Sequence, residues 1–245
     1  ARYGTFVTTP SISDKEAVVN IKTTLQNEYK SVKSVTLVSK IVDAQGQVLD
    51  RLTSSLPIKP FDQIEIEQEA LVRNPALWSP ETPVLYEVQT EVMENGKIVD
   101  TYETTFGIRT VEMRTDGFYL NGKLYPIKGT VNHQDFAGVG VALPDKINEY
   151  KIKLLKEMGS NGYRSGHHPP TPEVLDICDR LGMLVLDENR HLWSSEIGIR
   201  DLTTLILRDR NHPSVFMWCL ENEENLEGNI TGTRILETLV NLTHR

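Results

Sequence analysis

The hydrophobic pattern changes near residue 109, and this change constrains the fold more than any other feature of the sequence. Before it, apolar and polar residues alternate in "AVVNIKTTLQN", "SVTLVSKIVD", "QIEIEQEAL" and "VLYEVQTEVM", which is the pattern of half-buried strands. Turn-forming stretches such as "DAQGQ", "LPIKP" and "ENGK" separate them. Short strands with breaks at this spacing predict a β-sandwich of about seven strands over residues 1–108, with a scaffolding role.

From residue 109 onward, helical patterns alternate with short buried strands. A hairpin comes first, in "GFYLNGKLYPIKG", with Asn-Gly at its turn. Helices are predicted in "PDKINEYKIKLLKEMG" and "TPEVLDICDRLG", and two more over about 198–209 and 231–244. "MLVLDE" and "SVFMWCL" are continuous apolar runs, which is typical of strands buried on both faces. This order of elements predicts parallel βαβ units.

Two kinds of fold are built from such units, the open doubly wound sheet and the closed (β/α)8 barrel. The segment "KGTVNHQDFAGVGVALPD" contains glycines, but none at G-x-G-x-x-G spacing, so a nucleotide-binding sheet is disfavoured. A complete barrel takes roughly 250 residues. Only about 135 residues follow residue 109, which is enough for roughly four units.

Composition excludes several classes of protein. The net charge is −8 and no basic stripe is present, which argues against a nucleic-acid surface. No run approaches the roughly 18 apolar residues of a membrane span. Cys178 and Cys219 stand singly in apolar segments without metal-site spacing, so we interpret them as buried hydrophobic residues. They leave the cellular compartment open.

Polar residues follow each of four successive predicted strands in the second half of the chain. In parallel α/β folds the ligand site lies at the carboxyl ends of the strands, so these residues are expected to form one rim. A single such residue is most often a helix cap or part of a solvated loop, but four strand ends of the same kind indicate a catalytic or ligand-binding rim. Its members are Asn132, His133 and Asp135; Arg164, His167 and His168; Asn189, Arg190, His191 and Trp193; and Glu221, Asn222, Glu223 and Glu224.

The residue types at this rim narrow the chemistry. A nucleophilic serine needs a G-x-S-x-G turn, and the sequence has none. His167 and His168 are adjacent, so both cannot face one zinc ion from a regular strand. A carboxyl group at a strand end, surrounded by histidine, asparagine and tryptophan, suits general acid catalysis on a hydroxyl-rich substrate. Carbohydrate fits that description best.

Three stretches of the chain closely resemble glycoside hydrolase family 2, the β-galactosidase and β-glucuronidase group. They are "FGIRTVEMRTDGFYLNGKLYPIKGTVNHQD", "KEMGSNGYRSGHHPPTPEVLDICDRLGMLVLDE" and "LRDRNHPSVFMWCLENE", in continuous register from about residue 105 to residue 225. The resemblance implies a multi-domain β plus α/β protein. An immunoglobulin-like β-sandwich over residues 1–108 is followed by an incomplete (β/α)8 TIM barrel, its N-terminal half, over residues 109–245.

The family is one of retaining β-glycosidases, so the resemblance implies hydrolysis of terminal β-linked sugars, here of the β-galactosidase type. Glu223 takes the place of the general acid/base, and Asn222 that of the residue that binds the sugar's 2-hydroxyl. His133 and His167 match histidines that line the sugar subsite. Arg164 matches an arginine that supports the nucleophile; the alternative is a strand-end arginine with structural bonds only.

Other residues depart from the family pattern or take a structural interpretation. Glu221 stands where members commonly have a small residue. "LDENRHLW" lacks the acidic and histidine ligands by which some β-galactosidases hold magnesium, so we expect no metal and no cofactor. His168 falls where the family often has an aromatic residue, and His212, in "RDRNHPS", is interpreted as part of a structural turn.

A retaining mechanism needs a second carboxylate about 5 Å from the first, and the family places it well downstream of the Asn-Glu pair. The chain opens "ARYGTFVTTP" and closes in an uncapped helical pattern, so we expect an excerpt of a longer protein. The expected partners are a carbohydrate substrate and either the missing half of the barrel or further copies of the chain. We expect the chain alone to be inactive; the alternative class is a non-catalytic carbohydrate-binding or scaffold protein.

Overall fold

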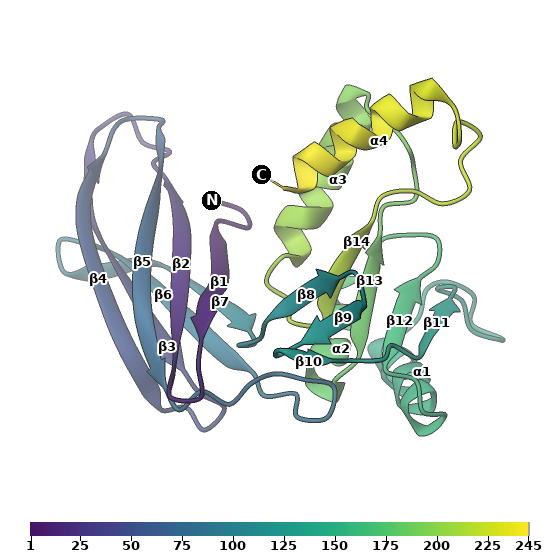
Figure 1. Cartoon of the computed structure of the whole chain (residues 1–245). Coiled ribbons are helices and arrows are strands. Elements are labelled where there is room, and N and C mark those ends of the chain that lie inside the picture. The colour runs from purple at the N-terminus through teal and green to yellow at the C-terminus, as the bar shows by residue number, and fades with distance from the viewer. Residues whose placement is uncertain (245) are drawn as a thin grey trace. The chain divides into compact units, whose positions relative to one another are not determined.

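The computed structural model describes residues 1–244 of the chain, which divide into two compact units (Figure 1). The first unit comprises residues 1–112 together with 120–122. The second comprises residues 113–119 and the chain that follows residue 122. Each unit has a hydrophobic core of its own. Among the described residues, no helix is both long enough and apolar enough to cross a membrane.

The first unit is a sandwich of two antiparallel sheets. One sheet has three strands in the order β1-β2-β5 and the other has four in the order β4-β3-β6-β7, which is an immunoglobulin-like arrangement. The strands are β1 (Thr5–Ile12), β2 (Glu16–Gln26), β3 (Lys33–Val42), β4 (Val48–Ile58), β5 (Gln63–Arg73), β6 (Tyr86–Glu94) and β7 (Lys97–Phe106).

The core of the sandwich follows directly from the alternating sequence. Successive side chains of a strand point to opposite faces, so every second residue of β2 is buried, among them Val19 and Ile21. They pack with Ile41 of β3 and Val88 of β6 from the other sheet. Each such side chain contributes roughly 1.5–3 kcal/mol to folding when fully buried. The inward-facing residues of both sheets thus account for the scaffold.

A three-stranded sheet, ordered β10-β9-β8, contains the predicted hairpin. Its strands are β8 (Val111–Arg114), β9 (Gly117–Leu120) and β10 (Lys123–Leu124). At the turn between β9 and β10, φ is +51° for Asn121 and +73° for Gly122. Two successive positive φ angles define the type I′ turn that Asn-Gly favours, so the local sequence accounts for the hairpin.

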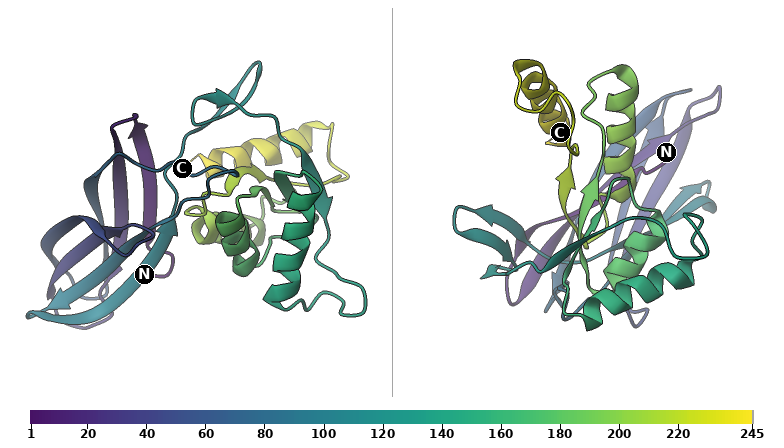
Figure 2. Two further views of the ribbon diagram at one scale, coloured as in Figure 1. Left: turned by 90° about the horizontal axis from the view of Figure 1, so that it is seen from below. Right: turned by 90° about the vertical axis from the view of Figure 1, so that its right-hand side faces the viewer.

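The second unit holds a four-stranded parallel sheet in the order β11-β12-β13-β14, with a helix after each strand (Figure 1, Figure 2). Its strands are β11 (Gly129–Asn132), β12 (Gly162–Ser165), β13 (Leu184–Glu188) and β14 (Val215–Cys219). Its helices are α1 (Asp145–Glu157), α2 (Pro172–Leu181), α3 (Glu196–Asp209) and α4 (Ile230–Thr243). Four consecutive βα units make half of an eight-stranded barrel.

The core of this unit lies between the sheet and its first two helices. Ile152 of α1 and Leu175 of α2 pack against Tyr163 of β12 and Val185 of β13. A second cluster joins α3 and α4 through residues that include Leu202 and Leu239. The apolar faces of the helices therefore hold the strands in register, and the carboxyl ends of the strands are left to carry polar residues.

The helices α3 and α4 begin slightly earlier than the hydrophobic pattern predicts. Ser195 caps α3 by accepting a hydrogen bond from the backbone N–H of Gly198. Asn229 caps α4 by accepting from the N–H groups of Thr231 and Gly232. Because these polar caps precede the first apolar residue of each helix, periodicity alone places the start one or two residues too late.

Two buried carboxyl groups lie between β13 and α3. Asp187 and Asp209 are both fully buried, and Arg208 donates to the two carboxylate oxygens of Asp209 at 2.6 Å each. Burial, together with the neighbouring charge of Asp209, raises the pKa of Asp187 to about 9. Asp187 therefore carries a proton at neutral pH, and Asp209 carries the charge that Arg208 balances.

Replacing Asp187 by asparagine is expected to remove this pH dependence. The folded-state pKa of Asp187 is raised above the ordinary value of 3.8. The protonated side chain therefore makes its full contribution to stability below pH 3.8, and this contribution is lost as the pH rises toward 9. As the pH rises from 5 to 9, the free energy of unfolding of the unchanged chain should therefore fall relative to that of Asp187→Asn, by at most about 1.4 kcal/mol per pH unit. Urea denaturation at several pH values measures it, with Asp201→Asn, an exposed acid on α3, as the control. Parallel curves would contradict the assignment.

Candidate active site

The parallel register of the sheet brings the predicted site residues to one edge. Arg164 of β12 lies opposite Val131 of β11 and Leu186 of β13. His167 follows β12 by two residues, and His133 follows β11 directly. Beyond β14, the backbone N–H of Asn222 donates to the carbonyl of Arg190 at 3.0 Å, which keeps this segment beside the one after β13.

The centre of this edge is the carboxylate of Glu188, the last residue of β13. Its side chain is 0% exposed. One oxygen accepts from Nε of Arg164 at 2.7 Å, and the other lies 2.8 Å from Nδ1 of His167. Nη2 of Arg164 donates to Oδ1 of Asn222 at 2.8 Å. Three of the predicted residues are thus joined through one buried acid, whose hydrogen bond raises the pKa of Arg164.

Glu188 is a residue of the candidate site that neither the pattern of strand ends nor the family resemblance predicts. A signal for it was present, because "MLVLDE" ends a strand buried on both faces with two carboxyl groups. A buried carboxylate is costly unless it is paired and hydrogen-bonded, so its partners were to be sought among the cations of neighbouring strand ends. Arg164 and His167 are those partners.

His133 lies beside His167. The two imidazole rings are edge to face, with their centroids 5.6 Å apart. The backbone carbonyl of His133 accepts a hydrogen bond from Nζ of Lys151, on α1, at 2.8 Å. The helix after β11 therefore fixes the backbone from which His133 extends toward the rim.

Glu223 differs from its neighbours in being exposed and in its backbone conformation. Its φ is +49°, in the left-handed region that costs a residue with a side chain roughly 1–3 kcal/mol. Within residues 1–244, no hydrogen bond or ion pair engages its carboxyl group. Asn222, directly before it, is held by Arg164. The rim therefore ends in a free carboxyl group on a constrained backbone.

Three further glutamates surround Glu223 in the segment after β14. The hydrogen bond between the carboxyl groups of Glu221 and Glu227, together with burial, raises the pKa of Glu221, and the same bond lowers the pKa of Glu227. Glu224 lies 3.5 Å from Nδ1 of His191. The His191 ring stacks on Trp193, with the centroids 4.1 Å apart. The predicted rim residues after β13 and β14 are thus in mutual contact.

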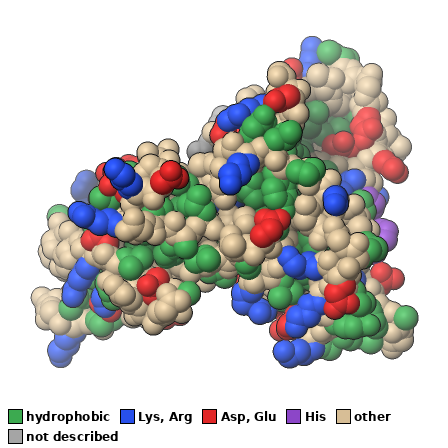
Figure 3. Space-filling model, turned by 60° about the horizontal axis from the view of Figure 1, so that its bottom comes forward, with side chains coloured by type: hydrophobic (Ala, Val, Ile, Leu, Met, Phe, Trp, Pro, Cys, Tyr) green, Lys and Arg blue, Asp and Glu red, His purple; other side chains and the backbone are tan. Residues whose placement is uncertain are grey.

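A hollow of about 640 Å³ opens beside this edge, which is within the range of small-ligand sites. On the face drawn in Figure 3, Lys and Arg side chains are interspersed with Asp and Glu side chains and form no single basic field. The hollow's polar lining offers imidazole, amide and guanidinium groups to a hydroxyl-rich ligand. These residues are His167, His168, Asn189, Arg190, His191, Arg200 and Arg208.

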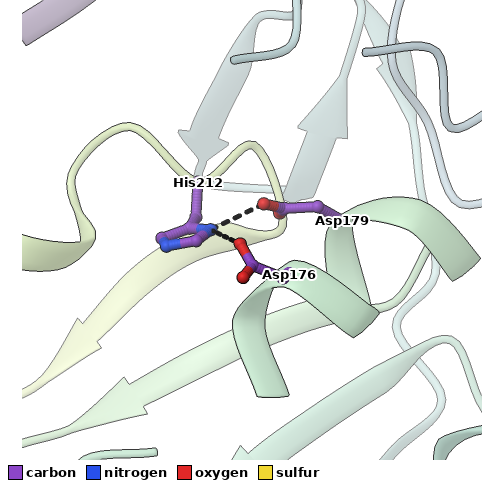
Figure 4. Close-up of side chains that lie close together, drawn as sticks. All are labelled: Asp176, Asp179 and His212. Atoms are coloured by element: carbon purple, nitrogen blue, oxygen red, sulfur yellow. Dashed lines mark hydrogen bonds and ion pairs between the residues drawn. The ribbon is translucent and has the colours of Figure 1, made fainter. Parts of the chain in front are cut away.

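A separate cluster lies beyond the other end of the sheet, where β14 begins. His212 precedes β14, and Asp176 and Asp179 lie one turn apart on α2, with their ligand atoms within 4.8 Å of one another (Figure 4). Nδ1 of His212 is 2.6 Å from Oδ2 of Asp179 and 4.0 Å from Oδ1 of Asp176. The other oxygen of Asp179 accepts from the N–H of Ser214 at 2.9 Å. Residue types and spacing suit a metal ion, but the nitrogen that faces both carboxylates already pairs with Asp179.

The charge of His212 explains this cluster without a metal. Burial alone would lower the pKa of His212, but the hydrogen bond and charge of Asp179, with the charges of Asp209 and Asp176, together raise it. Below this raised pKa, the imidazolium serves as the cation between two carboxylates. It ties the turn before β14 to α2, which is a structural role.

The His212–Asp179 pair is expected to give a pH-dependent stability. A histidine pKa raised above the ordinary 6.5 stabilises the folded state fully below that value, and the contribution is lost as the pH rises through the folded-state pKa. Asp179→Asn should reduce the free energy of unfolding more at pH 6 than at pH 8.5, measured by urea denaturation. Asp176→Asn, at the more distant and exposed carboxylate, should have the smaller effect. An equal loss at both pH values would contradict this account.

Comparison with known proteins now identifies the family. The model of the glycosyl hydrolases family 2 matches residues 4–109, and the model of that family's TIM barrel domain matches residues 111–198. The chain belongs to glycoside hydrolase family 2. The two models confirm the predicted fold class, an immunoglobulin-like sandwich followed by part of a TIM barrel.

Named relatives include two kinds of glycosidase. The β-galactosidase BoGH2A of Bacteroides ovatus is 42% identical over 234 residues, which cover 90% of this chain and 28% of that protein. A β-glucuronidase of Formosa agariphila is 33% identical over 226 residues, 88% of this chain and 23% of its own length. The chain thus spans about a quarter of the relatives it matches.

Solved structures of this family resemble the chain as well. A glycosyl hydrolase family 2 member from Bacteroides cellulosilyticus superposes with a TM-score of 0.94 at 34% identity, over 99% of this chain and 34% of that one. A Bacteroides uniformis β-glucuronidase gives a TM-score of 0.85 at 29% identity, over 98% of this chain and 32% of that one. The likeness extends over both units of the chain.

Proposed function

We propose that this chain is part of a retaining β-glycosidase that hydrolyses terminal β-linked sugars, with Glu223 as its general acid/base. The observation that carries the proposal is the arrangement at the strand ends: a free, exposed carboxyl group directly follows an asparagine that is held by the Glu188–Arg164 pair. The family and the names of the relatives support the same class of reaction.

In the proposed reaction, Glu223 donates a proton to the glycosidic oxygen as the bond to the leaving group breaks. It then accepts a proton from the water that releases the sugar. The amide of Asn222 has its oxygen committed to Arg164, so its Nδ2 is left to donate to the sugar's 2-hydroxyl. His133 and His167 line the sugar subsite. Arg164 supports both Asn222 and the nucleophile.

The second carboxylate of the retaining pair is proposed to come from a segment outside this chain. Glu188 is an unsuitable nucleophile, because it is fully buried and both its oxygens are engaged. Relatives three to four times as long have ample chain to supply that residue. We therefore propose that the chain alone is inactive, and that another segment completes the barrel beside β14 and β11.

We also propose that the modules run over residues 1–108 and 109–245, the first a scaffold and the second the N-terminal half of the barrel. The extents of the two family models support a boundary close to residue 110. For the sugar, we propose a β-galactoside, because relatives that are 42% and 36% identical are β-galactosidases. The β-glucuronide is the competing substrate.

Replacing Glu223 by glutamine in the full-length protein tests the acid/base role. We expect kcat on aryl β-galactosides to fall roughly 100- to 10,000-fold, because glutamine cannot exchange a proton. The fall should be greatest for poor leaving groups, which depend most on protonation. Added azide should restore turnover of substrates with good leaving groups, because azide attacks the glycosyl-enzyme without a general base.

The matched control is Glu237→Gln, an exposed glutamate of α4, which should leave kcat unchanged. A panel of aryl β-galactosides and β-glucuronides decides the sugar. Unchanged hydrolysis in Glu223→Gln would contradict the proposed role. Turnover by the 245-residue chain alone would contradict the proposal that the nucleophile lies outside it.

A further inference from the structure

Glu188 has no part in the proposed proton transfers, yet it is the most enclosed charged group at the candidate site. It ends β13, which lies between β12 and β14 in the sheet. From this central position it reaches Arg164 on β12 and His167 in the segment after β12. Both partners face the rim, and both were predicted from the sequence as site residues.

The pairing is strong because the carboxylate is enclosed. Charge-assisted hydrogen bonds of 2.7 and 2.8 Å to a fully buried carboxylate are stronger than the same contacts at a surface. A carboxylate with 0% exposure also cannot exchange its protein partners for water. Arg164 and His167 are therefore held in one arrangement.

Arg164 in turn fixes the orientation of the Asn222 amide. Its guanidinium is planar, so when Nε is fixed on Glu188 the direction of Nη2 is fixed as well. Nη2 only donates, so it binds the oxygen of the Asn222 amide and leaves the Nδ2 group free. An amide turned the other way would present two donors to each other. Glu188 thus determines which end of Asn222 meets a ligand.

His167 is oriented by the same carboxylate. A carboxylate accepts hydrogen bonds, so Nδ1 of His167 carries the hydrogen that it donates to Glu188. The remaining ring nitrogen, Nε2, is then left for a hydroxyl group of the sugar. One buried acid sets the binding atoms of two residues that belong to different strand ends.

We propose that Glu188 is a positioning residue of the active site: through Arg164 it aims the amide of Asn222 at the sugar's 2-hydroxyl, and it orients the ring of His167 directly. The inference rests on the proposed function, since it assumes that a sugar binds at this rim. It gives Glu188 a role in substrate recognition, apart from any contribution to the fold. The two roles predict different responses to removal of the 2-hydroxyl.

The test is Glu188→Gln in the full-length protein, with an aryl β-galactoside and its 2-deoxy analogue as the two substrates. Glutamine keeps the size of the side chain, but its oxygen can accept from only one of the two donors. We expect kcat/KM on the parent substrate to fall about tenfold or more, since the 2-hydroxyl contact strengthens at the transition state. The ratio of kcat/KM between parent and 2-deoxy substrate should also shrink, because only the parent substrate uses Asn222, whereas a disturbed His167 lowers kcat/KM on both substrates.

Three comparisons sharpen this result. Asn222→Ala should shrink the same ratio, and adding Glu188→Gln to it should change the ratio no further. Asp187→Asn, at the adjacent buried acid that faces α3, should leave the ratio unchanged. Glu188→Asp keeps the charge but shortens the side chain, so it should also shrink the ratio. It supplies the test if the glutamine variant fails to fold.

Equal losses on both substrates, with an unchanged ratio, would overturn the proposal and leave Glu188 a purely structural residue. Failure of the proposed function is recognised separately, by hydrolysis that survives Glu223→Gln. If the full-length protein turns over neither substrate, calorimetry can measure the dissociation constants of galactose and 2-deoxygalactose, and their ratio replaces the ratio of kcat/KM. An equal preference in the unchanged protein and in Glu188→Gln would then overturn the positioning role.

Discussion

The carboxylate of Glu188 must be paired because it is completely enclosed, and the arrangement of the candidate site depends on that pairing. The pair with Arg164 and the bond with His167 lie at the carboxyl end of the sheet. Through Arg164 the constraint reaches Asn222, directly before the exposed Glu223. A group that touches no ligand itself thus sets the directions of the groups proposed to bind one.

The period-two geometry of β13 explains how one strand serves two purposes. Successive side chains point to opposite faces, so Asp187 meets Asp209 and Arg208 of α3, whereas Glu188 meets the rim. The acid that faces the helix keeps its proton, because it is buried and its neighbour is another acid. The acid that faces the rim is paired with a guanidinium. The same two-residue sequence therefore joins the helix layer to the site.

Several features could be predicted from the sequence because they depend on local pattern. The continuous apolar runs locate the buried strands, and the carboxyl ends of parallel strands must meet, so His133, Arg164, His167 and Asn222 were expected at one edge. The family models confirm the fold class that the motifs implied. The roles of these residues stay predictions.

Other features depend on contacts between distant parts of the chain. That Glu188 joins Arg164 to His167 requires the register of β12 and β13 and the depth of the carboxylate, which no spacing in the sequence contains. The His212–Asp179 pair likewise joins residues 33 positions apart. The positive φ of Glu223 is set by the segment around it, because the residue type does not favour it.

The most direct test of the central claim is the protonation state of the His167 ring in the unchanged chain. Proton–nitrogen NMR correlations in a histidine-labelled sample distinguish hydrogen on Nδ1 from hydrogen on Nε2, and comparison with a His167→Gln sample assigns the signals. The account predicts a hydrogen on Nδ1 that is protected from solvent and becomes labile in Glu188→Gln. A ring that carries its hydrogen on Nε2 alone would contradict it, because Nδ1 would then have no hydrogen to donate to the Glu188 carboxylate.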